Sequence, residues 1–449
     1  MIFNLRTSLM LTAASLSLLV SCTPPTPPPS PTPLPTTTSL AVEPTVAATS
    51  PVPPADNTGS PTATPEPSPI LAPTATTIVV WESLPSAQAQ TLAEEARDFQ
   101  QAFPQYQITL QHYDSPEAFI NALTTGDADF DVVLASPVLL SSLWAADKLA
   151  PMSDFFPPSF IDGFAATTLQ GARQANNLWG LSDTAGFHLL LFYNRDLVDT
   201  PPANTDELLM LAQNLTQGKR WGLGVNSFDP LWVVPWLAAY GGWLTDEAGR
   251  PTLDTAAQES ALTLFLSWQA PSAGIAPIAT YGEVRDQFAN GNIAMVIDGE
   301  WAIGELAQAG DLNWSVALLP SLGQADDNQP AAPLVLARYW AISRDTSGNR
   351  ALAAAAFLEF ISRPERQLSW TTRYGLLPTR RSALNNPLIA NDPILRTSAA
   401  QMLAGNSIPL GTNANALLDA MRKPLRAMLE GELTPKAAAE MMQAAISGN

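Results

Sequence analysis

Hydrophobic and polar positions alternate between the strand period and the helix period from residue 77 onward. A β-branched apolar run at 77–81 predicts a strand, and apolar residues at helical spacing over 86–103 predict a helix that ends before Pro104. The alternation continues with strands expected at 106–110 and 130–135 and helices at 115–123 and 137–146. Strands that alternate with helices pair in parallel, so the pattern predicts an α/β layer architecture.

The pattern becomes more mixed in the middle of the chain, and helices dominate from residue 351 to the end. Further strands are expected at 189–193, 221–225, 293–298, 316–319 and 334–342, and further helices at 205–215, 229–240, 255–270 and 283–290. The patterned part spans about 373 residues, which is unusually long for a single hydrophobic core. We therefore expect two lobes or two domains.

The segment before residue 22 predicts a secretory signal. Residues 1–21 carry one charged side chain, Arg6, and the apolar run that follows it is too short to span a membrane comfortably. The run ends in Leu19-Val20-Ser21-Cys22, which resembles a bacterial lipobox, and Cys22 is the only cysteine of the chain. We expect a signal peptide at 1–21 and an extracytoplasmic protein held to the cell membrane by a lipid on Cys22. The alternative is a plain signal peptide with an incidental cysteine.

A proline-rich tract follows the cysteine. Of the 41 prolines, 17 lie between Thr23 and Thr76, in a stretch without lysine or arginine. Such a composition offers little apolar surface to offset the entropy of ordering. We expect residues 22–76 to form a disordered tether that keeps a folded part away from the membrane.

Charge and cysteine content exclude several classes of protein. The formal net charge is −19, so a nucleic-acid binder or a protein docking on anionic lipids through basic residues is not expected. One cysteine allows no intramolecular disulfide and no cysteine-based zinc or iron–sulfur site.

Catalytic motifs are absent from the sequence. Neither histidine, His112 or His188, has metal-site spacing, and no phosphate-binding or nucleophile-elbow glycine motif occurs. His188 is interpreted as a core histidine. Asp298 and Glu300 are the nearest carboxylate pair that could support glycoside hydrolysis, and such pairs arise by chance in an acidic protein. No metal or cofactor is expected.

Tryptophans lie where several predicted strands end, and ligands of α/β sheets bind beyond the carboxyl ends of strands. An indole offers a flat apolar face on which a sugar ring can stack. We interpret Trp232, Trp301 and Trp340 as ligand contacts, and we assign Trp81, Trp144 and Trp268 to the core.

From residue 78 onward the chain resembles the extracellular solute-binding proteins of ABC importers, in the sugar-binding branch that includes maltose-binding protein. The matching segments occur in the family's order: Ile78-Val79-Val80-Trp81, Thr125-Gly126-Asp127, Phe130-Asp131-Val132-Val133, Lys148-Leu149-Ala150-Pro151-Met152, Phe192-Tyr193-Asn194-Arg195-Asp196-Leu197, Tyr240-Gly241-Gly242, Phe288, Gly291, Ala294-Met295 and Gly299-Glu300-Trp301.

The resemblance implies a two-lobe periplasmic-binding-protein-like fold of type II, with each lobe a mixed sheet flanked by helices. It places residues 77–185 and 338–383 in the N-terminal lobe and residues 188–333 and 386–449 in the C-terminal lobe. It further implies a monomer that closes around its ligand by a hinge motion and delivers the ligand to an ABC permease.

The resemblance also implies a set of ligand contacts between the lobes. By position they are Glu82, Ser83, Ser136, Asp183, Asp229, Trp232, Trp301, Tyr339, Trp340, Asn413 and Asn415. The expected ligand is a mono- or oligosaccharide, although Leu231 and Leu418 replace family aromatics, so the maltodextrin-stacking surface is not reproduced. Three alternatives stay open: a cationic or other non-sugar solute, a surface glycoside hydrolase, and a ligand sensor for a signalling partner.

Overall fold

The structure is a computed structural model that describes residues 75–124, 129–277, 280–310, 312–323 and 329–448. The described residues belong to one compact unit within Ile70–Asn449. Cys22, the predicted signal peptide and nearly all of the predicted tether lie outside the described residues. None of the helices in the described part is both long and apolar enough to span a membrane.

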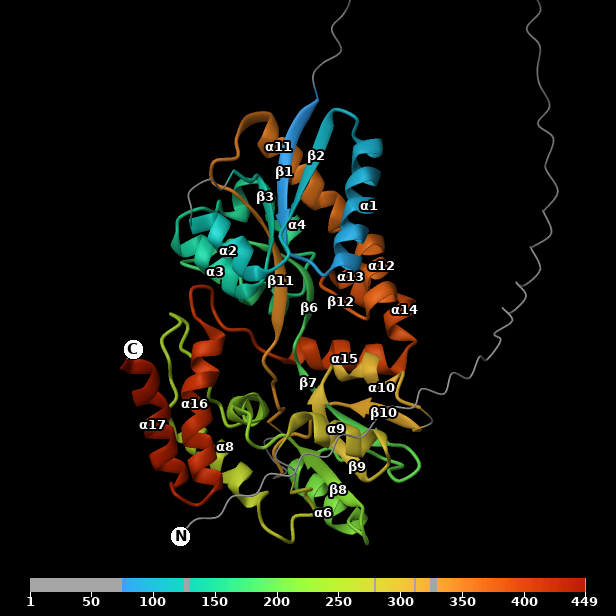
Figure 1. The fold of residues 1–449 in the computed structure, drawn as a ribbon, viewed down its shortest axis with the longest axis vertical. Helices are drawn as coiled ribbons and strands as arrows, with labels where there is room; N and C mark the ends of the chain where they lie inside the picture. The colour runs from blue at the N-terminus through green and yellow to red at the C-terminus, as the bar shows by residue number, and fades with distance from the viewer. Residues whose placement is uncertain (1–74, 125–128, 278–279, 311, 324–328, 449) are drawn as a thin grey trace, which may run out of the picture. The chain divides into compact units, whose positions relative to one another are not determined.

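Six strands form the first sheet, in the order β12-β6-β11-β3-β1-β2. Their bounds are Leu377–Pro378, Leu181–Gly186, Leu336–Ile342, Val132–Ala135, Thr76–Glu82 and Tyr106–His112. β1 pairs in parallel with β2 and with β3, which confirms the parallel α/β layer predicted from the alternating pattern. β11 pairs antiparallel with β3 and β6, and it lies between them (Figure 1).

Helices cover this sheet by burying one apolar face each. In α1 (Ser86–Ala102) the residues Leu92, Ala96 and Phe99 share one face and are buried. Phe99 meets Phe357 of α11 (Gly348–Ile361) edge to face, with the ring centroids 5.3 Å apart. Three further helices belong to this part: α2 (Pro116–Thr124), α3 (Pro137–Ala145) and α12 (Pro364–Tyr374). The helical spacing of apolar residues in this segment therefore correctly predicted the face of α1 that packs in the core.

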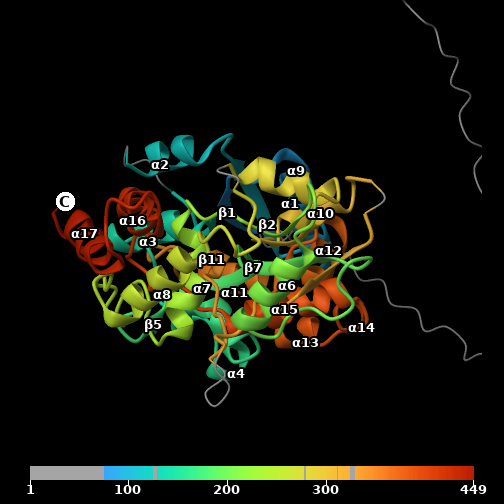
Figure 2. The ribbon, with the colours of Figure 1, turned by 90° about the horizontal axis from the view of Figure 1, so that it is seen from below.

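Four strands form the second sheet, in the order β10-β7-β9-β8. Their bounds are Trp314–Ala317, Leu189–Asn194, Ile293–Gly299 and Trp221–Val225. All residues of β9 are buried, which explains its continuous apolar run. The longer helices of this part are α6 (Thr205–Leu215), α8 (Ala256–Ser267), α9 (Tyr281–Ala289), α16 (Ala414–Leu429) and α17 (Pro435–Ser447). Figure 2 shows α16 and α17 side by side.

Each sheet has its own hydrophobic core. One cluster of buried residues surrounds the first sheet, and two others surround the second. The link between the end of β6 and the start of β7 is only two residues long, Phe187 and His188. The remaining elements are short or connect the two parts: η1 (Met152–Asp154), α4 (Pro158–Ile161), α5 (Ala166–Gln170), β4 (Arg173–Gln174), β5 (Asn177–Leu178), η2 (Pro230–Trp232), α7 (Val234–Ala239), α10 (Ala302–Leu306), α13 (Arg381–Leu384), α14 (Pro387–Ala390) and α15 (Pro393–Ala404).

Two expectations from the sequence need correction. The helix expected at 229–240 is split into η2 and α7, with a proline at the start of each. The strand expected at 316–319 runs over Trp314–Ala317, where its register pairs Val316 with Phe192 of β7. The sequence pattern also missed β6 altogether, because its middle residues are polar and nevertheless buried.

Candidate ligand-binding site

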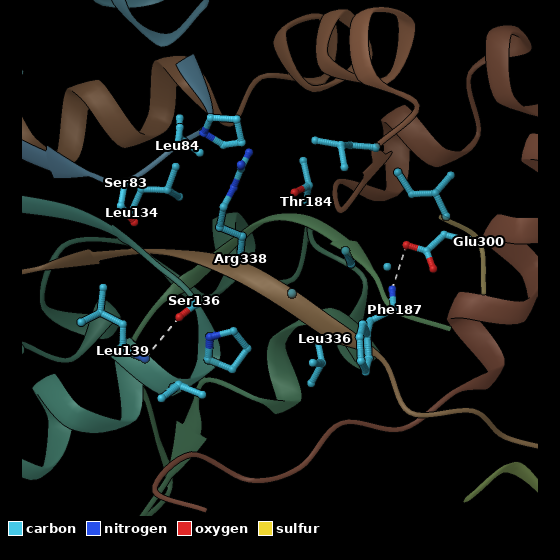
Figure 3. Close-up of a pocket in the computed structure, with 18 of the residues that line it drawn as sticks. Ser83, Leu84, Leu134, Ser136, Leu139, Thr184, Phe187, Glu300, Leu336 and Arg338 are labelled. Carbon is cyan, nitrogen blue, oxygen red and sulfur yellow. Dashed lines mark hydrogen bonds between the residues drawn. The ribbon is translucent and has the colours of Figure 1, made fainter. Parts of the chain in front are cut away.

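A cavity of about 660 Å³ lies beside the link between the two sheets, and its volume falls within the range of small-molecule sites. From the first sheet, its wall includes the segment after β1, the start of α3, the end of β6 and the start of β11. Phe187 and Glu300 also line the cavity (Figure 3). Asn415 lines it as well. The cavity thus receives side chains from the first sheet and its helices, from the link between the sheets, and from two segments beyond the first sheet: Glu300 directly follows β9, and Asn415 lies in α16.

The polar residues Ser83 and Ser136 follow the carboxyl ends of β1 and β3, where ligands of parallel sheets bind. Ser136 is the N-cap of α3 and accepts a hydrogen bond from the backbone N–H of Leu139 at 3.3 Å. Pro137 occupies the first turn, where its missing N–H costs nothing. The strand and the cap together fix the Ser136 hydroxyl at the cavity wall.

A buried ion pair forms part of the first sheet beside the cavity. Arg338 donates to Asp183 through Nε at 2.8 Å and through Nη2, and it donates to Gln88 through Nη1 at 2.9 Å. The other oxygen of Asp183 accepts from the indole N–H of Trp340 at 3.1 Å. Arg338 lines the cavity, but the carboxylate of Asp183 neutralises its charge.

The link between the sheets contributes an aromatic ring. Phe187 is 36% exposed and lines the cavity. Its backbone N–H donates to Glu300 Oε1 at 2.9 Å, and the N–H of Glu300 donates to the carbonyl of His188 at 3.0 Å. Burial raises the pKa of the Glu300 carboxyl to about 7, and its Oε2 is buried with no hydrogen-bond partner among the described residues.

Three of the residues expected at the site line the cavity: Ser83, Ser136 and Asn415. Trp301 lies one layer behind the wall. Its ring packs on Gly299 and lies 5.3 Å from the ring of Phe187, and its indole N–H donates to the hydroxyl of Tyr281. Trp301 therefore supports a cavity residue and does not itself line the cavity.

Three aromatic residues expected at the site are core side chains. Trp232 is 3% exposed, and its indole N–H donates to the carbonyl of Ile297 at 2.7 Å. Tyr339 and Trp340 are 1% and 2% exposed, and the N–H of Trp340 is occupied by Asp183. The structure corrects these expectations because each ring is enclosed by neighbouring elements and none of the three lines the cavity.

The polar residues expected at the site that do not line the cavity have structural partners nearby. Glu82 is buried and accepts from His112 Nδ1 at 2.8 Å. Asp229 caps η2 and pairs with Arg422 at 3.0 Å. Asn413 caps α16 by accepting from the N–H of Ala416 at 3.1 Å. Together with Asp183, these side chains are engaged by structural partners, several of them on other elements.

His188 is a core histidine, as the sequence indicated. It is fully buried, and its Nε2 lies 2.9 Å from the hydroxyl of Ser398. Burial lowers the pKa of its imidazole to about 3, so the ring is neutral at ordinary pH.

Sequence reasoning missed Phe187 and Arg338 as cavity residues, and it considered Glu300 only as a catalytic carboxylate. Phe187 lies just before the apolar strand β7, so its position in the sequence is that of one more core residue. The signal that could have identified it is the glycine directly before it, because a Cβ on Gly186 would overlap the Glu300 carboxylate.

Comparison with known proteins identifies the family. The sequence profile described as bacterial extracellular solute-binding protein matches residues 94–397. The chain is 22% identical over 327 residues to the maltotriose-binding protein of Pyrococcus abyssi, which covers 71% of this chain and 70% of that protein. It is 21% identical over 372 residues to the sn-glycerol-3-phosphate-binding periplasmic protein of Escherichia coli K12, which covers 74% of this chain and 82% of that protein.

A solved structure shows the same fold. It is the maltose/maltodextrin-binding domain of Bdellovibrio bacteriovorus bound to maltotriose, with a TM-score of 0.64 and 23% identity. The match covers 83% of this chain and 99% of that domain. This likeness confirms the predicted two-lobe fold of type II, with mixed sheets flanked by helices. The chain belongs to the bacterial extracellular solute-binding proteins.

Proposed function

We propose that this protein captures a small carbohydrate outside the cytoplasm and delivers it to the permease of an ABC importer. One observation carries the proposal: a cavity of about 660 Å³ is lined by residues of the first sheet, by Phe187 of the link, and by Glu300 and Asn415, which follow β9 and lie in α16. A ligand bound there touches both parts of the molecule at once. Its binding energy then favours the closed arrangement of the two parts, which is the form that a permease can recognise.

We propose that each lobe is built around one of the two sheets. The N-terminal lobe comprises about residues 77–185 and 338–383, and the C-terminal lobe comprises about residues 188–333 and 386–449. The first assignment is supported by β6, β11 and β12, which share a sheet with β1 although they lie far away in the sequence. Hinge motion is assigned to the segments that connect the sheets, including Phe187 and His188.

A carbohydrate suits the cavity better than an anion does. The relatives include a maltotriose-binding protein and an sn-glycerol-3-phosphate-binding protein. A phosphate needs a cation that is free to pair with it. Among the described cavity residues, Arg338 is the only basic side chain, and Asp183 already neutralises it. Hydroxyls and amides at Ser83, Ser136 and Asn415 are left to bind sugar hydroxyls.

A cationic solute is the second candidate, and Glu300 is the observation that favours it. Among the described residues that line the cavity, Glu300 is the only acidic side chain, and it pairs with no cation there. A ligand amine could neutralise it. If the protein binds a carbohydrate, neutral saccharides should stabilise it; if it binds a cationic solute, charged amines such as spermidine should stabilise it instead.

A glycoside hydrolase is a weaker reading of the same cavity. Hydrolysis uses two carboxyl groups that flank one glycosidic bond. Asp298, the partner suggested by the sequence, is 1% exposed and is held by Arg285 at 3.0 Å and Tyr281 at 2.7 Å. It does not line the cavity, so Glu300 has no second carboxylate opposite it.

A thermal-shift panel tests the proposed function. Maltotriose and other neutral saccharides, sn-glycerol 3-phosphate and spermidine are each added to the protein. A neutral saccharide at 100 times its dissociation constant should stabilise the fold by about 2.7 kcal/mol. Stabilisation by spermidine alone would favour the cationic candidate, and chromatographic detection of saccharide cleavage would contradict a pure binding role. Co-purification with a permease would separate an importer component from a sensor.

We also propose that Cys22 carries a lipid and that residues 22–76 tether the binding lobes to the membrane, since the lipobox-like sequence Leu19-Val20-Ser21-Cys22 precedes the tract. A Cys22→Ser protein is expected to leave the membrane fraction and appear in the soluble one. Fractionation of cells that produce either protein measures this. Equal membrane retention of both proteins would contradict the anchor.

A further inference from the structure

Phe187 is a large apolar side chain that stays 36% exposed in the cavity wall. Its φ is 63°, in the left-handed region that residues other than glycine rarely adopt. Such a conformation is strained for a residue other than glycine and persists only where the surroundings enforce it. Neither burial nor backbone preference therefore accounts for a phenylalanine at this position, and backbone outliers of this kind cluster at ligand sites.

The neighbours of Phe187 hold its backbone in place. The Glu300 carboxylate accepts the Phe187 N–H at 2.9 Å, and the Glu300 N–H in turn donates to the next carbonyl, that of His188, at 3.0 Å. Gly186 leaves the space that the carboxylate occupies, because a Cβ there would overlap Glu300 Oε1. Two hydrogen bonds to Glu300 and the space at Gly186 thus hold the backbone of residues 187 and 188 in place.

The ring of Phe187 also has support. The ring of Trp301 lies 5.3 Å from it, with an angle of 34° between the planes. Trp301 is itself fixed, because its indole N–H donates to Tyr281, whose hydroxyl donates to Asp298 at 2.7 Å. Phe187 is therefore backed by a second aromatic ring while its own ring still lines the cavity (Figure 3).

We propose that Phe187 is the specificity-determining platform of this site, on which the apolar face of a pyranose ring stacks, and that Glu300 is the residue that positions it. The inference rests on the proposed carbohydrate function. A pyranose presents C–H groups on its faces and hydroxyls at its edge, so one flat aromatic ring and a few polar side chains suffice to bind it. Acyclic solutes such as sn-glycerol 3-phosphate or spermidine present no such face.

Binding measurements on full-length variants test the platform. The probes are maltotriose and trisaccharides of β-linked glucose, galactose and mannose, each titrated calorimetrically. Phe187→Ala should weaken the binding of the saccharide that the wild type takes by about tenfold or more, which corresponds to about 1.4 kcal/mol. Phe187→Trp should keep the affinity within a few-fold. Leu352→Ala, which removes a side chain that is 62% exposed on α11, is the matched control and should bind as the wild type does.

Two outcomes separate the platform from the function on which it rests. If the wild type binds no saccharide of the panel, the proposed function fails. If the wild type binds one and Phe187→Ala binds it equally well, the function stands and the platform is refuted. Because Phe187 is partly exposed, the alanine variant should unfold within a few degrees of the wild type, so the affinities compare folded proteins.

The positioning role of Glu300 is tested by ligand affinity, because a loss of stability alone would not show that Glu300 acts through the Phe187 ring. Glu300→Gln keeps an oxygen that accepts the Phe187 N–H and should retain affinity, whereas Glu300→Ala should lose it. In the Phe187→Ala background, Glu300→Ala should cause no further loss, because its effect passes through the ring. A full additional loss in the double variant, or no rescue by glutamine, would show that Glu300 acts on the ligand directly and would overturn the positioning role.

Discussion

Replacing Gly222 with alanine is expected to destabilise the protein by about 3 kcal/mol or more. Gly222 lies in β8, directly against the backbone of α6. An added Cβ would overlap the carbonyl oxygen of Ala212 and lie 2.5 Å from its carbonyl carbon and Cα. Backbone atoms cannot rotate away, so α6 would have to move from the sheet. Overpacking of this kind costs about 1–3 kcal/mol, and more where backbone must shift.

Gly282→Ala is the matched control for this change. Gly282 lies in α9, has an ordinary φ, and has no neighbouring atom within 4 Å of an added Cβ. Alanine is favoured over glycine in helices by about 1 kcal/mol, so this variant should be as stable as the wild type or slightly more stable. Urea unfolding of the three proteins measures the difference. If Gly222→Ala and Gly282→Ala unfold at the same urea concentration, α6 can move aside without loss of stability.

Asp183→Ala should lower the free energy of unfolding by about 3 kcal/mol. The side chain of Asp183 is 9% exposed and that of Arg338 is 19% exposed, and removing one partner of a buried pair costs about 3–5 kcal/mol. The change also leaves the indole N–H of Trp340 without its acceptor. Arg338 would then offer an uncompensated cation to the cavity, so the variant should gain affinity for sn-glycerol 3-phosphate.

Two further variants sharpen the Asp183 experiment. Asp183→Asn keeps an oxygen for Trp340 but removes the charge, so it separates the ion pair from the hydrogen bond. Glu94→Ala removes a partner of Arg373 from an exposed pair, in which the side chains are 44% and 48% exposed, and should cost less than 1 kcal/mol. If Asp183→Ala unfolds at the same urea concentration as Glu94→Ala, the buried pair contributes no special stability.

The sequence predicted elements well where the pattern is local. The helix α6 and the strand β8 begin and end where the pattern placed them, because each combines a clear period with recognisable ends. The strand β6 could not be found in this way. Its central residue Asp183 is polar, and in the buried interior it is paired with Arg338, 155 residues away, and with the indole N–H of Trp340.

The candidate site shows the same limit. Ser83 and Ser136 were found because they directly follow strands whose carboxyl ends meet at one edge. Trp232 lies in η2 and Trp340 lies within β11, where partners distant in sequence, the carbonyl of Ile297 and the carboxylate of Asp183, hold them in the core. Phe187 is exposed because of the backbone conformation of a two-residue link, which no hydrophobic pattern encodes.

The central place of β11 in the first sheet has a consequence for how the chain acquires its structure. β3 and β6 both use β11 as a neighbour, yet β11 begins only at Leu336, after every strand of the second sheet has been passed. A chain that emerges from its N-terminus can pair β1 with β2 and β3, but it cannot join β6 to them. Sheet completion therefore requires closing a long loop, which slows folding and keeps the emerging N-terminal part incomplete until most of the protein has left the cytoplasm.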